Sequence, residues 1–130
     1  MESVKLKVES QRREFDFENL TVYQKGLKFV NAILSLSEGF SGRVQYSVGE
    51  QLRRASVSIV NNIAEGSDKR TTKERMQFYR TALSSARECV PMLTICRDQE
   101  YITSTVHDGL RVNCLELCRM LRGLINSVGS

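Results

Sequence analysis

The chain has little of what catalysis usually requires: among its 130 residues there is only one histidine, His107. A single histidine leaves no paired base, no second imidazole ligand and no evident catalytic triad, so we expect His107 to be exposed or to cap a helix. No glycine-rich phosphate-binding motif is present. Carboxylate pairs such as Glu65 with Asp68 lie in no pattern that acid and base catalysis needs. The sequence therefore predicts a protein that is not an enzyme.

Long apolar runs are also missing. No stretch approaches the roughly 20 consecutive apolar residues of a membrane-spanning helix. Residues 1–15 mix both charge signs without an apolar core, which is not the pattern of a secretory signal. We therefore expect a cytoplasmic protein with no membrane contact. The length fits a single domain with a sizeable core, and the net charge of +4 permits an acidic partner such as nucleic acid without requiring one.

Four cysteines are compatible with a metal site or with two disulfides. Zinc ligands, however, usually come from tight knuckles with about two to four intervening residues, whereas these cysteines lie along predicted helices among apolar residues. A free cysteine behaves as a small buried apolar residue. We therefore expect free thiols in the core, with no metal and no cofactor, at Cys89, Cys96, Cys114 and Cys118.

The first predicted helix begins near Val22 and ends near Gly39. Its apolar residues recur at steps of three and four, which is the period of an amphipathic helix. Asn19 or Thr21 offers a side-chain oxygen to cap its first turn. The residues before it, 1–18, show no clear period, and we interpret them as a loose arm.

The second predicted helix starts near Tyr46 or Ser47 and stops at Gly66, and the rest of the chain is arranged around it. It is apolar on two faces, so it needs two neighbouring helices. A polar line runs between those faces. Within it, Arg54 and Glu65 form either a buried or half-buried polar link that sets the register or part of a binding site. The line consists of Arg54, Ser58, Asn61 and Glu65.

The third predicted helix is capped by Thr71 or Thr72, and the fourth carries the most regular heptad pattern of the chain, over residues 110–128. Pro91, the only proline, lies within the third helix. Because apolar residues continue at helical spacing beyond it, we expect Pro91 to bend the helix near residues 87–89 rather than to end it.

These four segments are joined by short polar links, and no segment alternates apolar and polar residues as a strand would. The pattern predicts an all-α protein: an antiparallel up-down-up-down four-helix bundle over residues 19–130, preceded by the arm at residues 1–18. Part of the second helix's apolar surface, with Phe40 and Tyr46 nearby, either packs inside the chain or meets another subunit.

Basic residues are the remaining signal. They gather in the second helix, in the turn after it and at the start of the third helix, and further arginines follow at Arg80, Arg111, Arg119 and Arg122. Such side chains can contact phosphates, although the acidic residues between them are also typical of a solvated surface. The predicted nucleic-acid-binding residues are Arg53, Arg54, Lys69, Arg70, Lys73 and Arg75.

Residues 40–66, FSGRVQYSVGEQLRRASVSIVNNIAEG, resemble the signature of the four-helix-bundle proteins encoded in intervening sequences of bacterial 23S ribosomal RNA genes. The resemblance covers most of residues 20–103, and the segments QLRRA and NIAEG at fixed spacing are its most specific part. Two departures are Ser41 and Val60, where the family usually has proline. Without the second proline, the second helix should be straighter in this chain.

The resemblance implies a non-enzymatic helical protein that assembles as a homopentameric ring with a positively charged surface. The family is also similar to the accessory proteins of diversity-generating retroelements, which bind a reverse transcriptase and nucleic acid. On this basis we expect a ribosomal protein-like bundle that binds RNA or a ribonucleoprotein through the six basic residues named above. The alternative is a protein-interaction scaffold or an accessory subunit for a nucleic-acid enzyme.

Overall fold

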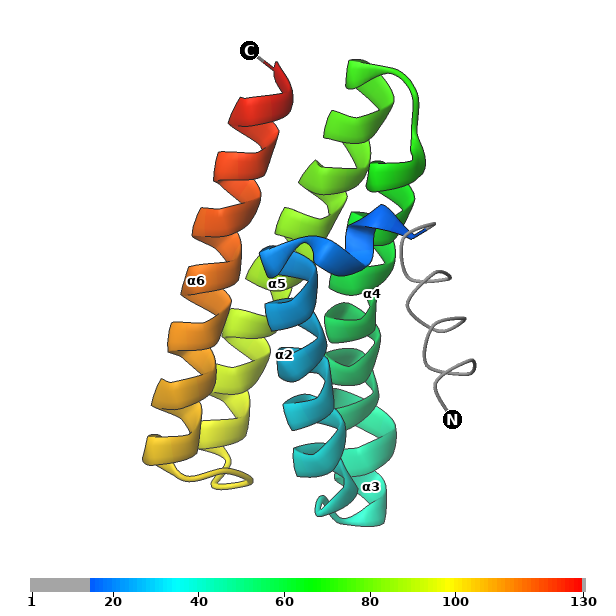
Figure 1. Ribbon diagram of the computed structural model, residues 1–130. Coiled ribbons are helices and arrows are strands. Elements are labelled where there is room, and N and C mark those ends of the chain that lie inside the picture. The colour runs from blue at the N-terminus through cyan, green and yellow to red at the C-terminus, as the bar shows by residue number, and fades with distance from the viewer. Residues whose placement is uncertain (1–14, 130) are drawn as a thin grey trace, which may run out of the picture.

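A computed structural model describes residues 15–129, and all of its regular structure is helical (Figure 1). Within these residues there is no strand, so the predicted all-α class is confirmed. Residues 1–14 of the predicted arm lie outside the described residues. The four long helices are α2 (Thr21–Glu38), α4 (Glu50–Asp68), α5 (Thr72–Asp98) and α6 (Ser104–Gly129).

Successive long helices run in opposite directions in Figure 1 and lie side by side as a bundle. Helix α5 packs against both α4 and α6, and α2 closes the bundle by contacting α4 and α6. With 18 residues against 27 in α5, α2 covers only part of the bundle's length. Before it, the 3₁₀ helix η1 (Asp16–Asn19) lies against α2 and α4. There the ring of Phe17 meets the ring of Tyr23 at a centroid distance of 4.9 Å.

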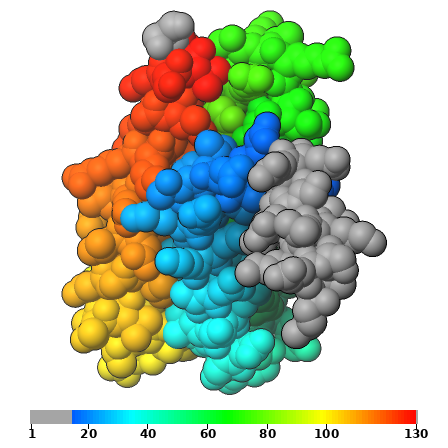
Figure 2. All heavy atoms as spheres, in the orientation of Figure 1, coloured from blue at the N-terminus to red at the C-terminus, as the bar shows by residue number. Residues whose placement is uncertain are grey.

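One apolar core runs through the bundle because each helix turns its apolar seam inward. Figure 2 shows the side chains of α2 and α6 meeting along the front of the molecule. The side chains that are almost wholly buried come from every long helix, so each helix contributes to the core. They include Phe29 and Ile33 of α2, Leu52, Ile59 and Ile63 of α4, Leu93 of α5, and Leu117 and Leu121 of α6.

The first helix is not capped in the predicted way. Its N-cap position is Leu20, with no side-chain hydrogen bond to the first turn, so neither Asn19 nor Thr21 acts as the cap. The reason is that η1 leads directly into α2, and the polar groups at this junction bond to one another. The side-chain amide of Gln24, for example, donates to the Glu18 carbonyl at 3.0 Å. The end of α2, by contrast, lies where the sequence predicted it.

The second helix starts earlier and ends later than predicted. A short helical turn, α3 (Gly42–Val44), and a π-helical turn, η2 (Gln45–Gly49), run without a break into α4. Helix α4 then continues past Gly66 to Asp68. Gly66 is therefore not the helix stop. Instead it gives room to Tyr79 of α5, because a Cβ atom at this position would lie 2.6 Å from the Tyr79 ring.

The start of α5 agrees with the sequence prediction. The Thr71 hydroxyl oxygen accepts the Glu74 backbone N–H at 3.2 Å, and the hydroxyl donates to the Glu74 carboxylate at 2.9 Å. This pairing satisfies a backbone donor that the helix cannot satisfy itself. The helix then continues through Pro91 to Asp98, so Pro91 does not end it, as predicted.

All four cysteines are free and buried, which confirms their predicted place in the core. Cys89 of α5 and Cys114 of α6 are adjacent, and the Cys89 thiol also donates to the Ser85 carbonyl at 3.5 Å. The hydrogen bond with Cys89, burial, and the negative charge of an ionised Cys89 all raise the pKa of the Cys114 thiol. Burial raises the pKa of Cys96 and Cys118 as well. The thiols of Cys96, Cys114 and Cys118 therefore keep their protons at neutral pH in the folded protein.

The close approach of Gly66 and Tyr79 makes α4 sensitive to one added methyl group. Gly66→Ala overpacks this contact at a cost of about 1–3 kcal/mol, which exceeds the roughly 0.5–1 kcal/mol by which alanine is favoured over glycine in a helix. We expect a lower free energy of unfolding in urea. Gly123→Ala is the matched control and should raise that free energy, because outside the adjoining residues and backbone of its own helix no atom lies within 4 Å of its Cβ position. A gain in both variants would contradict the contact.

The raised pKa of Cys114 makes stability depend on alkaline pH. An unfolded thiol ionises around its ordinary pKa of 9.0, whereas the folded thiol stays protonated. Its stabilising contribution is therefore complete below that pH and is lost as the pH rises above it, by about 1.4 kcal/mol per thiol between about pH 8 and pH 10. Urea unfolding of the reduced protein measures this loss. Cys114→Ala should show a shallower pH dependence than the wild type, and equal slopes would refute the assignment.

Candidate nucleic-acid interface

Metal-binding clusters and membrane-spanning helices are both absent from residues 15–129. No three side chains of His, Cys, Asp or Glu converge there as possible ligands. None of the helices in this part of the chain combines the length and the apolar character that crossing a bilayer demands. Its notable polar features are a buried histidine and several groups of basic side chains.

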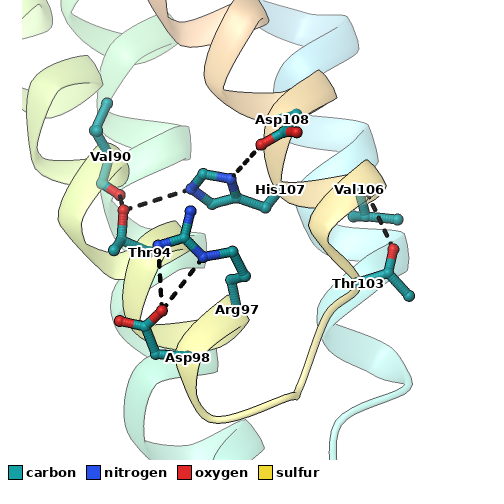
Figure 3. A network of polar contacts seen from close by, with 8 residues as sticks. All are labelled: Val90, Thr94, Arg97, Asp98, Thr103, Val106, His107 and Asp108. Carbon is teal, nitrogen blue, oxygen red and sulfur yellow. Dashed lines mark hydrogen bonds and ion pairs between the residues drawn. The ribbon is translucent and has the colours of Figure 1, made fainter.

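His107 is buried, with 3% of its surface exposed, so the prediction of an exposed or capping histidine is wrong. Figure 3 shows its ring between α5 and the first turn of α6. The Nδ1–H donates to the Asp108 carboxylate at 2.8 Å, and Nε2 lies 3.4 Å from the Thr94 hydroxyl. The cap of α6 is Thr103, whose hydroxyl oxygen accepts the Val106 N–H at 3.1 Å.

A signal for this burial exists in the sequence. His107 lies three residues before Leu110 and seven before Cys114, so it extends the apolar seam of α6 by one step. Both ring nitrogens have partners, which lets a polar ring occupy a core position without an unpaired buried group. Because its hydrogen bond with Thr94 joins α6 to α5, we assign His107 a structural role.

The six predicted nucleic-acid-binding residues do not form one patch. Arg53 and Arg54 lie near the start of α4, whereas Lys69 follows its last residue, about 22 Å further along the helix axis. The other three lie in the turn after α4 and in the first turn of α5. The structure thus divides the set into a pair, Arg53 and Arg54, and the turn cluster, which we define as Lys69, Arg70, Lys73 and Arg75.

Arg53 is engaged within the chain. Its guanidinium donates to the Gln45 carbonyl at 2.9 Å, in the π-helical turn η2. A π-helical turn departs from the regular hydrogen-bond pattern of the α-helix, so its carbonyls are open to side-chain donors. Arg53 therefore stabilises the junction between η2 and α4, a role that the sequence prediction missed.

Arg54 points into solvent, with 81% of its side chain exposed, and pairs with Glu50 at 3.0 Å. Glu65 pairs instead with Lys69, at 3.6 Å. The structure thus excludes a buried link between Arg54 and Glu65 within the chain. The physical reason is that both side chains are exposed on the same helix, and each reaches an opposite charge four residues away.

The turn cluster contains two cations that neighbours hold in place and two that are free. The Lys69 ammonium lies over the Phe78 ring, 5.2 Å from its centroid, and the Arg75 Nε–H donates to the Lys69 carbonyl at 2.6 Å. Arg70 and Lys73 are exposed and form neither an ion pair nor a hydrogen bond with any described residue. Within the turn cluster, these two side chains are the ones most available to an anionic partner.

Further exposed cations follow along α5 and α6, and the predicted set did not include them. On α5, Lys73 and Arg80 border a shallow depression of about 520 Å³ that is otherwise lined by polar side chains. The sequence signal for this surface is the seven-residue spacing from Lys73 through Arg80 to Arg87, which keeps side chains on one side of a helix. The additional cations are Arg80 and Arg87 of α5 and Arg111, Arg119 and Arg122 of α6.

The fold is similar to that of a solved structure. A crystal structure of a protein with unknown function from the S23 ribosomal protein family of Bacteroides thetaiotaomicron aligns with a TM-score of 0.76 and 24% sequence identity. The alignment covers 81% of this chain and 95% of that chain. At this level of identity the similarity establishes a shared fold. Among curated proteins, none matches the sequence.

The family assignment comes from the sequence. Residues 18–123 match the profile described as 23S rRNA-intervening sequence protein, and this range includes α2, α4, α5 and most of α6. Neither that description nor the one given to the solved structure names an enzymatic activity. The resemblance carried by residues 40–66 is thereby confirmed, and the chain belongs to the 23S rRNA-intervening sequence protein family.

Proposed function

We propose that this protein is a non-enzymatic, homo-oligomeric bundle of antiparallel helices that binds RNA or a ribonucleoprotein through its basic surface. The observation that carries the proposal is the pair Arg70 and Lys73, two exposed cations with no acidic partner among the described residues. They stand beside Lys69 and Arg75 at one end of the bundle, where α4 turns into α5 (Figure 1). The family's connection with 23S rRNA intervening sequences favours RNA as the nucleic acid.

Electrostatics favours the turn cluster over the pair on α4 as the first contact. A cation without a partner meets a phosphate without first breaking an ion pair, and each neutralised phosphate releases counterions. An exposed pair such as Arg54 with Glu50 is worth only about 0–1 kcal/mol, so Arg54 can exchange its carboxylate for a phosphate at little cost. Arg53, whose guanidinium is bound to a backbone carbonyl, contributes charge rather than a direct contact.

Filter binding of a labelled RNA with a hairpin and a single-stranded tail tests the proposal. Affinity should fall steeply between about 50 mM and 200 mM salt. The double variant Arg70→Gln/Lys73→Gln should bind more weakly and lower the salt slope by about two, one for each phosphate that is no longer neutralised. The matched control is Lys28→Gln/Arg43→Gln, which removes two exposed cations from other segments and changes the net charge of +4 by the same amount.

Two outcomes would count against RNA binding: no affinity at low salt, or an affinity that does not change with salt. The alternative is then a scaffold or accessory subunit for a nucleic-acid enzyme such as a reverse transcriptase. A protein partner that remains bound after nuclease treatment of a cell lysate would support this alternative, because RNA-mediated association does not survive that treatment.

A separate observation supports the homo-oligomer. The groove between α4 and α5 carries opposite charges, Arg54 and Glu88, that two copies of the chain can pair. Phe40 is buried inside the chain, but Tyr46 is 77% exposed and Ile95 of α5 is 50% exposed, so apolar surface remains for a second copy to cover. The groove is lined by Gln51, Arg54, Ala55, Ser58, Ser85, Glu88 and Met92.

Light scattering coupled to size-exclusion chromatography measures the assembly. We expect a mass several times that of the 14.8 kDa chain, with a pentameric ring as the specific expectation. Ile95→Glu places a charge at the proposed contact and should lower the mass at equal protein concentration. Val112→Glu, at an apolar residue of α6 that is 59% exposed, should leave the mass unchanged. A monomeric wild-type protein would contradict the proposal.

A further inference from the structure

We propose that the outer surface of α5 and α6 binds the phosphate backbone of double-stranded RNA. This inference rests on the RNA binding proposed above and names the form of RNA that the surface fits. Lys73 belongs to the turn cluster as well, so the new surface continues that cluster along the bundle. We define the basic face as two rows of exposed cations: Lys73, Arg80 and Arg87 on α5, and Arg111, Arg119 and Arg122 on α6.

The row on α5 is regular. Lys73, Arg80 and Arg87 are seven residues apart, so each step advances about 10.5 Å along the helix and rotates by only about 20°. The three side chains therefore project from one side of α5 over about 21 Å. All three are exposed, and none forms an ion pair or a hydrogen bond with a described residue.

The arginines of the row on α6 also lie on one side of their helix. Arg111 and Arg122 are eleven residues apart, which is close to three turns, so they share one side of the helix about 16 Å apart. Arg119 lies three residues before Arg122 and is its neighbour on the helix surface. These arginines are also exposed and without an ion pair in the described part of the chain.

Contacts in the core place the two rows partly alongside each other. Cys89 of α5 is adjacent to Cys114 of α6, and the two helices run in opposite directions (Figure 1). Arg80 is nine residues before Cys89, so it lies level with the residue nine positions after Cys114, which is next to Arg122. The rows therefore overlap around Arg80, Arg87, Arg119 and Arg122, while Lys73 and Arg111 extend toward opposite ends of the bundle.

The surroundings of Cys118 show that the rows also converge. Burial and the neighbouring Cys114 raise the pKa of the Cys118 thiol, while the positive charges of Arg122 and Arg87 lower it. One thiol of α6 thus lies close to a cation from each row. The charges of Arg87 and Arg122 consequently both act at one point of the contact between α5 and α6.

Three of the acidic residues near the basic face have contacts that direct them away from it. Glu116 of α6 pairs with Lys25 of α2. Glu88 of α5 lines the groove on the α4 side, and Glu74 closes the cap formed by Thr71. Asp98 and Asp108 do share the outer sides of α5 and α6, but they lie beyond Arg87 and Arg111 and accept hydrogen bonds from Arg97 and His107. A phosphate chain lying over the rest of the basic face would therefore meet cations without competing carboxylates, which concentrates positive potential on this side of the bundle.

The basic face lacks the aromatic side chains on which unpaired bases stack. Helix α6 contains no Phe, Tyr or Trp, and its His107 is buried. Of the two aromatic residues in α5, Tyr79 is buried and Phe78 lies beneath Lys69. The exposed apolar side chains among the arginines, Val112 and Leu115, are aliphatic. Double-stranded RNA is recognised through its shape and backbone rather than through unpaired bases. Two rows of cations on packed helices fit such a regular backbone.

Filter binding of one RNA duplex and of its two separated strands tests the inference, because the sequences are the same and only the pairing differs. The wild type should bind the duplex more tightly than either strand. Arg87→Gln/Arg122→Gln, which removes one cation from each row, should lower duplex affinity roughly tenfold to a hundredfold near 0.1 M salt and reduce the salt slope by about two. The control Lys28→Gln/Arg43→Gln should retain most of the affinity, and circular dichroism should show equal helicity in all variants.

These experiments distinguish a failure of the basic-face proposal from a failure of the RNA-binding proposal. No salt-dependent binding of either RNA form would remove both proposals. If the wild type binds and Arg70→Gln/Lys73→Gln weakens binding, but Arg87→Gln/Arg122→Gln behaves like the control, the turn cluster stands and the basic face is wrong. Tighter binding of a single strand than of the duplex would likewise overturn the assignment to double-stranded RNA.

Discussion

The packing of α5 between α4 and α6 is the contact on which the other features of this protein depend. Small side chains on α5, such as Ala82 and Ala86, are wholly buried, and Gly66 of α4 admits the Tyr79 ring, so the neighbouring helices approach closely. Each large apolar side chain buried in this way contributes about 1.5–3 kcal/mol. Because the helices are held together along their length, charges on their outer sides keep a fixed spacing, and a surface with a defined pattern of cations becomes possible.

The helices could be predicted because their apolar period is a property of the chain itself. Ile33, Ile59, Leu93 and Leu121 lie on seams that are visible in the sequence, and all four are buried. Structural details that depend on a partner helix were harder to predict from the sequence. Glycine at position 66 suggests a helix end in isolation, whereas its neighbour Tyr79 makes it a packing position. The same holds for polar residues, since the burial of a histidine depends on hydrogen bonds that another helix supplies.

The candidate site could be predicted as a collection of charges but not as a surface. Arg53 and Arg70 look alike in the sequence, yet one is bound to a backbone carbonyl and the other is free. That difference arises from the π-helical turn, which no apolar period reveals. The spacing of the cations on α5 is also present in the sequence. Their position partly alongside the arginines of α6 is not, because it follows from how Cys89 and Cys114 meet in the core.

The π-helical turn η2 has a consequence for how sequences of this family compare. Val44 precedes Leu52 by eight residues, which would separate them by about 80° around a regular α-helix, yet both are buried. The π-helical turn accommodates one extra residue. Val44 and Leu52 therefore lie on the same side of the helix, as they would if they were seven residues apart in a regular α-helix. A relative that lacks this residue would keep the same interior with a regular helix. A one-position gap at this turn is therefore the physically correct alignment for such a relative. An alignment without the gap would pair each residue of the QLRRA segment with a residue of the relative that is not structurally equivalent.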